Sequence, residues 1–216
     1  MAQVFHPAFN TISRVSIFGG VFFLSVLIWI LGGIYRSSYV TEADVVRDQP
    51  IPFSHKHHVG GLGLDCRYCH TSVEESSFAG MPPTKTCMNC HSVIWADSPM
   101  LEPVRRSYRT DTPVLWTRVH HLPGYVYFDH HIHVAKGVGC VNCHGEIDNM
   151  PLVAQQATLY MEWCLECHRH PEAAVGPRSE AFNLKWQASG DRAALGRRLV
   201  EEYQVQERTD CVDCHR

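Results

Sequence analysis

The amino-acid sequence predicts a mostly α-helical and irregular fold, with one N-terminal transmembrane helix and a larger outer domain that has little sheet. Two observations predict it: a long apolar run near the N-terminus, and five short cysteine motifs spread through the rest of the chain. Glycine and proline recur between the motifs, as in GGLG at 60–63 and PP at 82–83. Because both residues interrupt regular strands and helices, we expect short helices joined by loops.

The apolar run, SIFGGVFFLSVLIWILGGIY at residues 16–35, contains no charged side chain. A helix of this length covers about 30 Å, which is enough to cross the hydrocarbon core of a bilayer. The alternative is a cleaved signal peptide. The run is longer than a typical signal core, and the flank GGIYRSSYV offers no clear A-x-A cleavage site. We therefore expect a retained anchor, with boundaries at 1–15 for the N-terminal tail, 16–35 for the membrane helix and 36–216 for the outer domain.

The cysteines carry the most specific signal in the chain. All ten fall in C-x-x-C pairs, and a histidine follows each pair directly, in CRYCH, CMNCH, CVNCH, CLECH and CVDCH. In c-type haem attachment the two thiols bond to one haem, and the adjacent histidine binds its iron. The pattern therefore predicts five covalently bound haem c groups. The attachment cysteines are Cys66, Cys69, Cys87, Cys90, Cys140, Cys143, Cys164, Cys167, Cys211 and Cys214, and the proximal histidines are His70, His91, His144, His168 and His215.

Two other uses of such cysteines fit less well. A disulfide framework does not require a histidine after every second cysteine. A zinc site combines two C-x-x-C half-motifs, so five such motifs would leave one without a partner.

An internal repeat organises the outer domain. FSHKHH begins at Phe53 and FDHHIH begins at Phe128, so F-x-H-x-x-H precedes a haem motif twice, and a second motif follows each time. Residues 53–91 and 128–168 are therefore expected to be two copies of a two-haem module, with the fifth haem at 211–215. A helix is expected from about 191 to 204, ahead of this last motif. With so few residues for each haem, the haems themselves would form the core.

The second axial ligands are predicted from the same repeat. Histidines at i and i+3 lie near one face of a helical turn. We expect His55, His58, His130 and His133 to bind iron, one of each pair serving a haem of its own module and the other a neighbouring haem. For the fifth of these second ligands, His120 is the first choice, and Met150 and Met161 are the alternatives.

Haem attachment also predicts the location of the chain. Covalent c-type attachment in bacteria takes place outside the cytoplasmic membrane, so we expect the bulk of the chain to be periplasmic and the N-terminal tail to be cytoplasmic. The formal net charge of −3 gives no indication of a nucleic-acid partner.

The F-x-H-x-x-H and C-x-x-C-H arrangement resembles the class III multihaem cytochromes. More closely, FSHKHHVGGLGLDCRYCHTSVE, PPTKTCMNCHS, YFDHHIHVAKGVGCVNCHG and MEWCLECHRHPE resemble the pentahaem cytochrome c subunit of alternative complex III. The resemblance covers most of the chain and implies a subunit of a quinol-oxidising membrane complex. It implies an iron–sulfur protein, quinol-binding membrane subunits and a monohaem cytochrome c as partners, and a periplasmic cytochrome or copper protein as the electron acceptor.

Two other functions remain open at this stage. A stand-alone membrane quinol dehydrogenase also combines one helix with several haems, although the duplication and the fifth motif count against it. A multihaem reductase needs an open haem face, whereas plausible axial ligands are plentiful here. We therefore expect an electron-transfer subunit that is not catalytic alone.

Overall fold

The computed structural model describes residues 4–215 and divides them into two compact units, up to Glu42 and from Ala43 onward. The first unit is dominated by α1 (Ala8–Arg36), which is 29 residues long, strongly apolar and exposed along its whole length. By length and composition this helix can cross a membrane, as predicted. It begins eight residues before the predicted run, because polar residues such as Asn10 and Ser13 also continue the helix.

The second unit consists of short helices joined by loops, as predicted. Helix α2 (Ser38–Thr41) belongs to the first unit. The elements of the second unit are η1 (Lys56–Gly61), α3 (Cys66–Cys69), α4 (Thr84–His91), η2 (Pro99–Leu101), α5 (Glu102–Thr110), α6 (His130–Ala135), α7 (Val141–His144), η3 (Ile147–Asn149), α8 (Met161–Arg169), η4 (Pro171–Ala173), η5 (Arg178–Glu180), α9 (Arg192–Glu202) and α10 (Cys211–Cys214). Across residues 4–215 the only β-structure is a set of isolated bridges, such as Val138 with Val175. The prediction of little sheet is confirmed.

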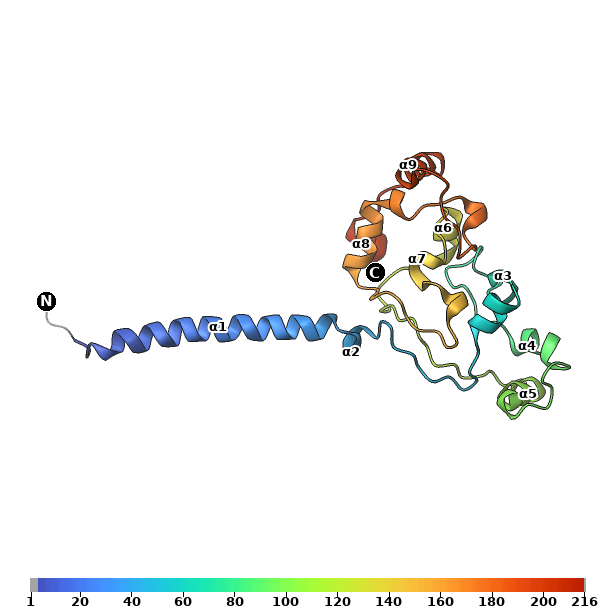
Figure 1. Ribbon diagram of the computed structural model, residues 1–216, viewed down its shortest axis with the longest axis horizontal. Helices are drawn as coiled ribbons and strands as arrows, with labels where there is room; N and C mark the ends of the chain where they lie inside the picture. Colours follow the sequence, from blue (N-terminus) through green and yellow to red (C-terminus); the bar gives the residue numbers. More distant parts are fainter. Residues whose placement is uncertain (1–3, 216) are drawn as a thin grey trace. The chain divides into compact units, whose positions relative to one another are not determined.

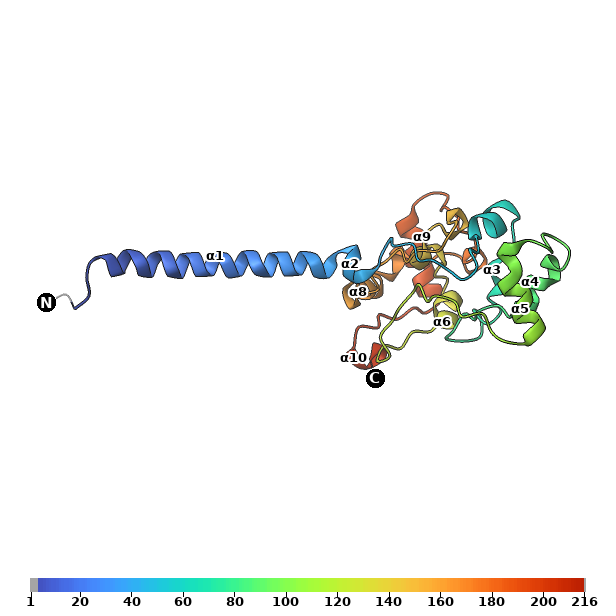
Figure 2. The same ribbon diagram turned by 90° about the horizontal axis from the view of Figure 1, so that it is seen from below.

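Within this second unit, α3, α4 and α5 lie on one side and α8 on the other, with α7 between them (Figure 1). Helix α10 and the end of the chain lie beside α8 in both views (Figures 1 and 2). Helix α9 packs on η4. The five haem motifs therefore lie on α3, α4, α7, α8 and α10, each a short helix within one unit.

The protein core of this unit is sparse. Between residues 43 and 215, the buried hydrophobic side chains are small or medium in size and include no aromatic ring: Ala43, Ile51, Val73, Leu101, Val104, Ala154, Val175, Ala181 and Leu199. A hydrophobic cluster formed by Ile51, Leu101 and Val104 holds α5 near the second haem motif through Cys87 and Met88. So small a core leaves most of the unit without buried apolar side chains, which agrees with a fold organised around bound groups.

Candidate haem-binding sites

The attachment motifs share one local structure. Each second cysteine lies one turn of helix after the first, so both thiols are on the same side of a short helix. Asp65 caps the first of these helices by accepting a hydrogen bond from the backbone N–H of Arg67. All ten cysteine thiols are free, and no group of three or more metal-binding side chains forms within residues 4–215.

Three pairs of imidazoles lie at spacings that suit two ligands of one iron. The ring centres of His58 and His91 lie 6.1 Å apart, and those of His133 and His168 also lie 6.1 Å apart. The rings of His130 and His144 lie 6.4 Å apart and are nearly parallel, at 8°. An imidazole nitrogen binds a first-row metal ion at about 2.0 Å, so two imidazoles on opposite sides of one iron have ring centres about 6 Å apart. These pairs therefore fit one iron each.

The first histidine of the first module belongs to the same pattern. Burial, followed by the nearby His70 and His58, lowers the pKa of His55 to about 4. In both modules, then, the first histidine of F-x-H-x-x-H lies near the proximal histidine of the module's first haem motif. The second histidine of F-x-H-x-x-H faces the proximal histidine of the module's second haem motif. Burial is also the largest cause that lowers the pKa of His144, to about 3. Such rings are neutral at pH 7, and the neutral imidazole is the form that binds metal.

The phenylalanine of the repeat holds both histidines in the same way in each copy. Phe53 stacks on His58 with ring centres 4.4 Å apart and meets His55 edge-on at 4.9 Å. In the second copy, Phe128 stacks on His133 at 4.7 Å and meets His130 edge-on at 4.8 Å. The interplanar angles are the same in both copies, 26° and 88°. One aromatic ring therefore fixes two imidazoles, although His58 lies on a π-turn and His133 on an α-helix.

Backbone carbonyls orient the same rings. Nδ1 of His58 lies 2.9 Å from the carbonyl oxygen of Ser54, and Nδ1 of His133 lies 2.6 Å from that of Asp129. His70, His91 and His130 make the corresponding contacts with the carbonyl oxygens of Gly80, Ile94 and Ser77, at 2.7, 2.9 and 2.8 Å. Nδ1 then carries the proton and Nε2 is left for iron. This is the outer-shell arrangement that metal-binding histidines use, and sequence analysis missed these carbonyls because they have no side-chain signature.

His120 does not lie with the fifth motif. Its Nε2 is 3.2 Å from Nδ1 of His144, and the two ring centres are 4.6 Å apart. The ring of His215 instead lies 5.8 Å from that of Tyr125, and the backbone N–H of Tyr127 donates to the carbonyl of Cys214. The structure therefore brings His120 to the third motif. Met161, one of the two methionine alternatives to His120, is 61% exposed.

Neighbouring motifs touch one another. The side-chain amide of Asn89 in the second motif donates to the hydroxyl of Tyr68 in the first, at 3.1 Å. Arg67 of the first motif stacks on Phe182, 4.5 Å from the ring centre, next to Ala181, whose carbonyl accepts from the backbone N–H of Cys140 in the third. The first motif thus contacts the second directly and the third through residues 181–182.

The thiols show the same order of neighbours. Burial and the nearby Cys87 raise the pKa of Cys69, and a hydrogen bond with Cys66 raises the pKa of Cys140. Burial, with Cys167 and Cys164 nearby, raises the pKa of Cys143 to about 11. Burial and Cys214 raise the pKa of Cys164. The motifs therefore adjoin in the order second, first, third, fourth, fifth.

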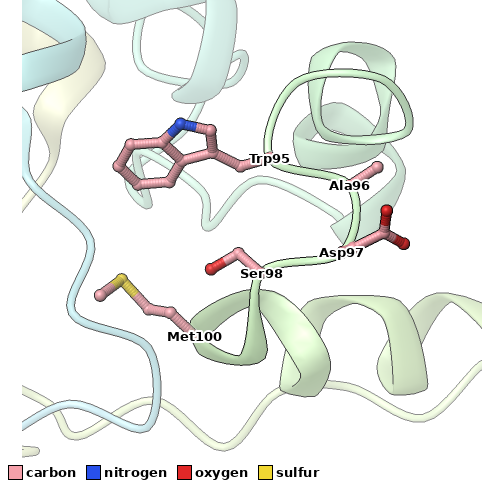
Figure 3. A pocket seen from close by; sticks show the side chains of 5 residues that line it. All are labelled: Trp95, Ala96, Asp97, Ser98 and Met100. Atoms are coloured by element: carbon pink, nitrogen blue, oxygen red, sulfur yellow. The ribbon is translucent and has the colours of Figure 1, made fainter.

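A shallow depression lies beside the second motif. It is lined by Trp95, Ala96, Asp97, Ser98 and Met100. The side chains of Trp95, Ser98 and Met100 extend towards the same open space, whereas Asp97 points away (Figure 3). It is open to solvent and has no converging acid, base or nucleophile, so it is not an enclosed substrate site.

The fold and these sites define a multihaem cytochrome c domain, which binds haem c covalently. Residues 126–216 match the model of the family described as cytochrome c7 and related cytochrome c. The chain is also similar to the menaquinone reductase, multiheme cytochrome c subunit, of Nitratidesulfovibrio vulgaris Hildenborough. The two are 38% identical over 99 residues, which are 45% of this chain and 46% of that relative. The chain thus spans about half the length of the curated relative it matches.

Proposed function

We propose that this chain binds five haem c groups and relays electrons between partner proteins in a quinone-linked membrane complex. The observation that carries the proposal is the repeated F-x-H-x-x-H arrangement, in which one phenylalanine ring contacts two imidazoles. In each copy the ring centre of the second histidine lies 6.1 Å from that of a proximal histidine. Iron held between two imidazoles changes oxidation state with little change of geometry, which suits electron transfer.

In this proposal, the residues of the chain bind, orient and space the haems. The ten cysteines attach them, and His70, His91, His144, His168 and His215 are the proximal ligands. His55, His58, His130 and His133 cap the opposite faces of the first four. The order of adjoining motifs supports a single linear path from the second attachment site, through the first, third and fourth, to the fifth.

The wider assembly follows from the anchor and from the resemblances. We propose that α1 crosses the cytoplasmic membrane once, with residues 36–216 on the periplasmic side. The subunit would then resemble the pentahaem subunit of alternative complex III. It would relay electrons from quinol-binding membrane subunits, with an iron–sulfur protein and a monohaem cytochrome as neighbours, to a periplasmic cytochrome or copper protein.

The opposite direction of electron flow is the second candidate. The relative from N. vulgaris is a subunit of a menaquinone reductase, so a related chain can serve a complex that reduces quinone. Membranes that contain the complex separate the two directions. Quinol-dependent reduction of the c-type haems, followed by reoxidation by a periplasmic cytochrome, supports outward flow. Reduction of the haems by a periplasmic donor but not by quinol supports flow towards quinone.

The haem content tests the proposal itself. A pyridine haemochrome assay on purified full-length chain should give five c-type haems per polypeptide. The double variant Cys211→Ala/Cys214→Ala should give four, because only one attachment site is lost. Four or fewer haems in the fully matured natural chain would contradict the proposal.

A further inference from the structure

Six imidazoles of the proposed ligand set direct Nδ1 at a partner atom, and one of the six has a different kind of partner. His58, His70, His91, His130 and His133 each direct Nδ1 at a backbone carbonyl oxygen, over 2.6–2.9 Å. His144 instead directs Nδ1 at another side chain, Nε2 of His120, over 3.2 Å. The two rings meet edge-on at 76°. His120 lies 24 residues away in the chain, in the connection between the two modules.

We propose that His120 is a positioning residue that orients His144 and sets the redox potential at the third attachment site. The proposal rests on the proposed function, in which Nε2 of His144 binds iron. The proton of the His144 ring is then on Nδ1, which donates to Nε2 of His120. His120 must in turn carry its own proton on Nδ1. The hydrogen bond fixes the rotation of the His144 ring and increases its basicity, as outer-shell partners of metal-binding histidines do.

The chemistry of the acceptor makes this site adjustable. A backbone carbonyl is present whatever side chain its residue carries, so the orientation of the other five rings does not depend on one side chain. The orientation of His144 depends on the imidazole of His120, which is half-buried and contacts the His144 ring directly. A more basic ligand donates more electron density to iron and stabilises the ferric state. Loss of the acceptor should therefore raise the potential at this site alone, which lies in the middle of the proposed path.

Three variants of the full-length, haem-loaded chain test the proposal. His120→Phe keeps a ring of similar size and removes the acceptor. His120→Gln supplies a side-chain oxygen that can accept from the same N–H. His121→Phe is the matched control, because His121 is the next residue and its Nε2 contacts the carbonyl oxygen of Arg118 instead. Haem content, an optical redox titration and the EPR spectrum of the ferric haems are measured for each.

The expected result is specific to one haem. All three variants should keep five haems; His120→Phe should raise one midpoint potential and change one set of low-spin g values. His120→Gln should restore most of both, and His121→Phe should match the natural chain. If His120→Phe instead loses one haem, recovery of five haems in His120→Gln supports the proposal as well.

Other results overturn it. An unchanged redox titration in His120→Phe would contradict the proposal. So would a midpoint potential that rises as much in His120→Gln as in His120→Phe, or failure of both variants to load haem. Conversion of one haem to high spin in His120→Phe would also overturn it, because His120 would then be an axial ligand. Fewer than five haems in the natural chain contradict the proposed function instead, so the two failures are distinguishable.

Discussion

At the scale of single residues, the F-x-H-x-x-H segment explains why the two modules have the same site despite different local backbones. The aromatic ring faces one histidine with its plane and meets the other with its edge, at matching angles in both copies. The carbonyl of the following residue, Ser54 or Asp129, orients the second histidine. Sequence analysis could select these histidines from their repeated spacing. It could not assign His120, whose partner is set by tertiary contact.

The second histidines should act as axial ligands that can be removed one at a time. Replacing His58 or His133 by alanine leaves one iron with a single protein ligand, which converts it to high spin. Optical and EPR spectra of each variant should show one high-spin haem and the others unchanged. His57→Ala is the control for His58→Ala, since the His57 ring stacks against Trp95 at 6.5 Å and faces no proximal histidine in its own module. A fully low-spin spectrum in His58→Ala would remove that residue from the ligand set.

At the scale of elements, local signals decided which helices were predictable. The helix expected from 191 to 204 matches α9, because Asp191 caps it by accepting from the backbone N–H groups of Ala193 and Ala194. Helix α5 was not predicted. It carries no haem motif, and ion pairs of Glu102 with Arg105 and Arg109 lie along a mostly polar sequence. Its place is set by burial of Val104 against the second motif, which a local pattern does not reveal.

Gly196 in α9 gives a prediction whose sign depends on packing. In an isolated helix, Gly→Ala stabilises by about 1 kcal/mol. Here a methyl group at Gly196 would overlap the backbone carbonyl oxygen of Glu172 in η4, and overpacking typically costs about 1–3 kcal/mol. Gly196→Ala should therefore speed hydrogen exchange of the α9 amides in the haem-loaded chain. Ala194→Gly is the control, because Ala194 is exposed and the substitution should lower the stability of the helix by about 1 kcal/mol through helix propensity alone. Slower exchange in Gly196→Ala would mean that the helices do not pack this closely.

At the scale of the whole molecule, the order of the motifs predicts how haems influence one another. In the proposed path the fifth site has one neighbour and the third has two. Because adjacent charged groups shift one another's redox equilibrium electrostatically, Cys211→Ala/Cys214→Ala should shift the potential of one remaining haem. Cys140→Ala/Cys143→Ala should shift two. An optical redox titration of both variants measures this, and equal numbers of shifted haems would exclude the linear order.

The last prediction concerns what the chain does without its partners. In the proposed function, two-sided histidine ligation leaves no iron position for substrate at the first four sites, and the depression beside Trp95 is open to solvent. A quinol needs an enclosed and largely apolar pocket with a few converging polar groups, and α1 alone does not enclose such a pocket. The purified chain should therefore be reduced by dithionite and reoxidised by a periplasmic cytochrome or copper protein, with little turnover when a quinol analogue is the donor.

The matched positive control is the intact complex from the same membranes, which should turn over with quinol if electrons flow outward. Robust quinol-dependent turnover by the isolated chain would instead identify a stand-alone quinol dehydrogenase, because the quinol site would then lie on this polypeptide.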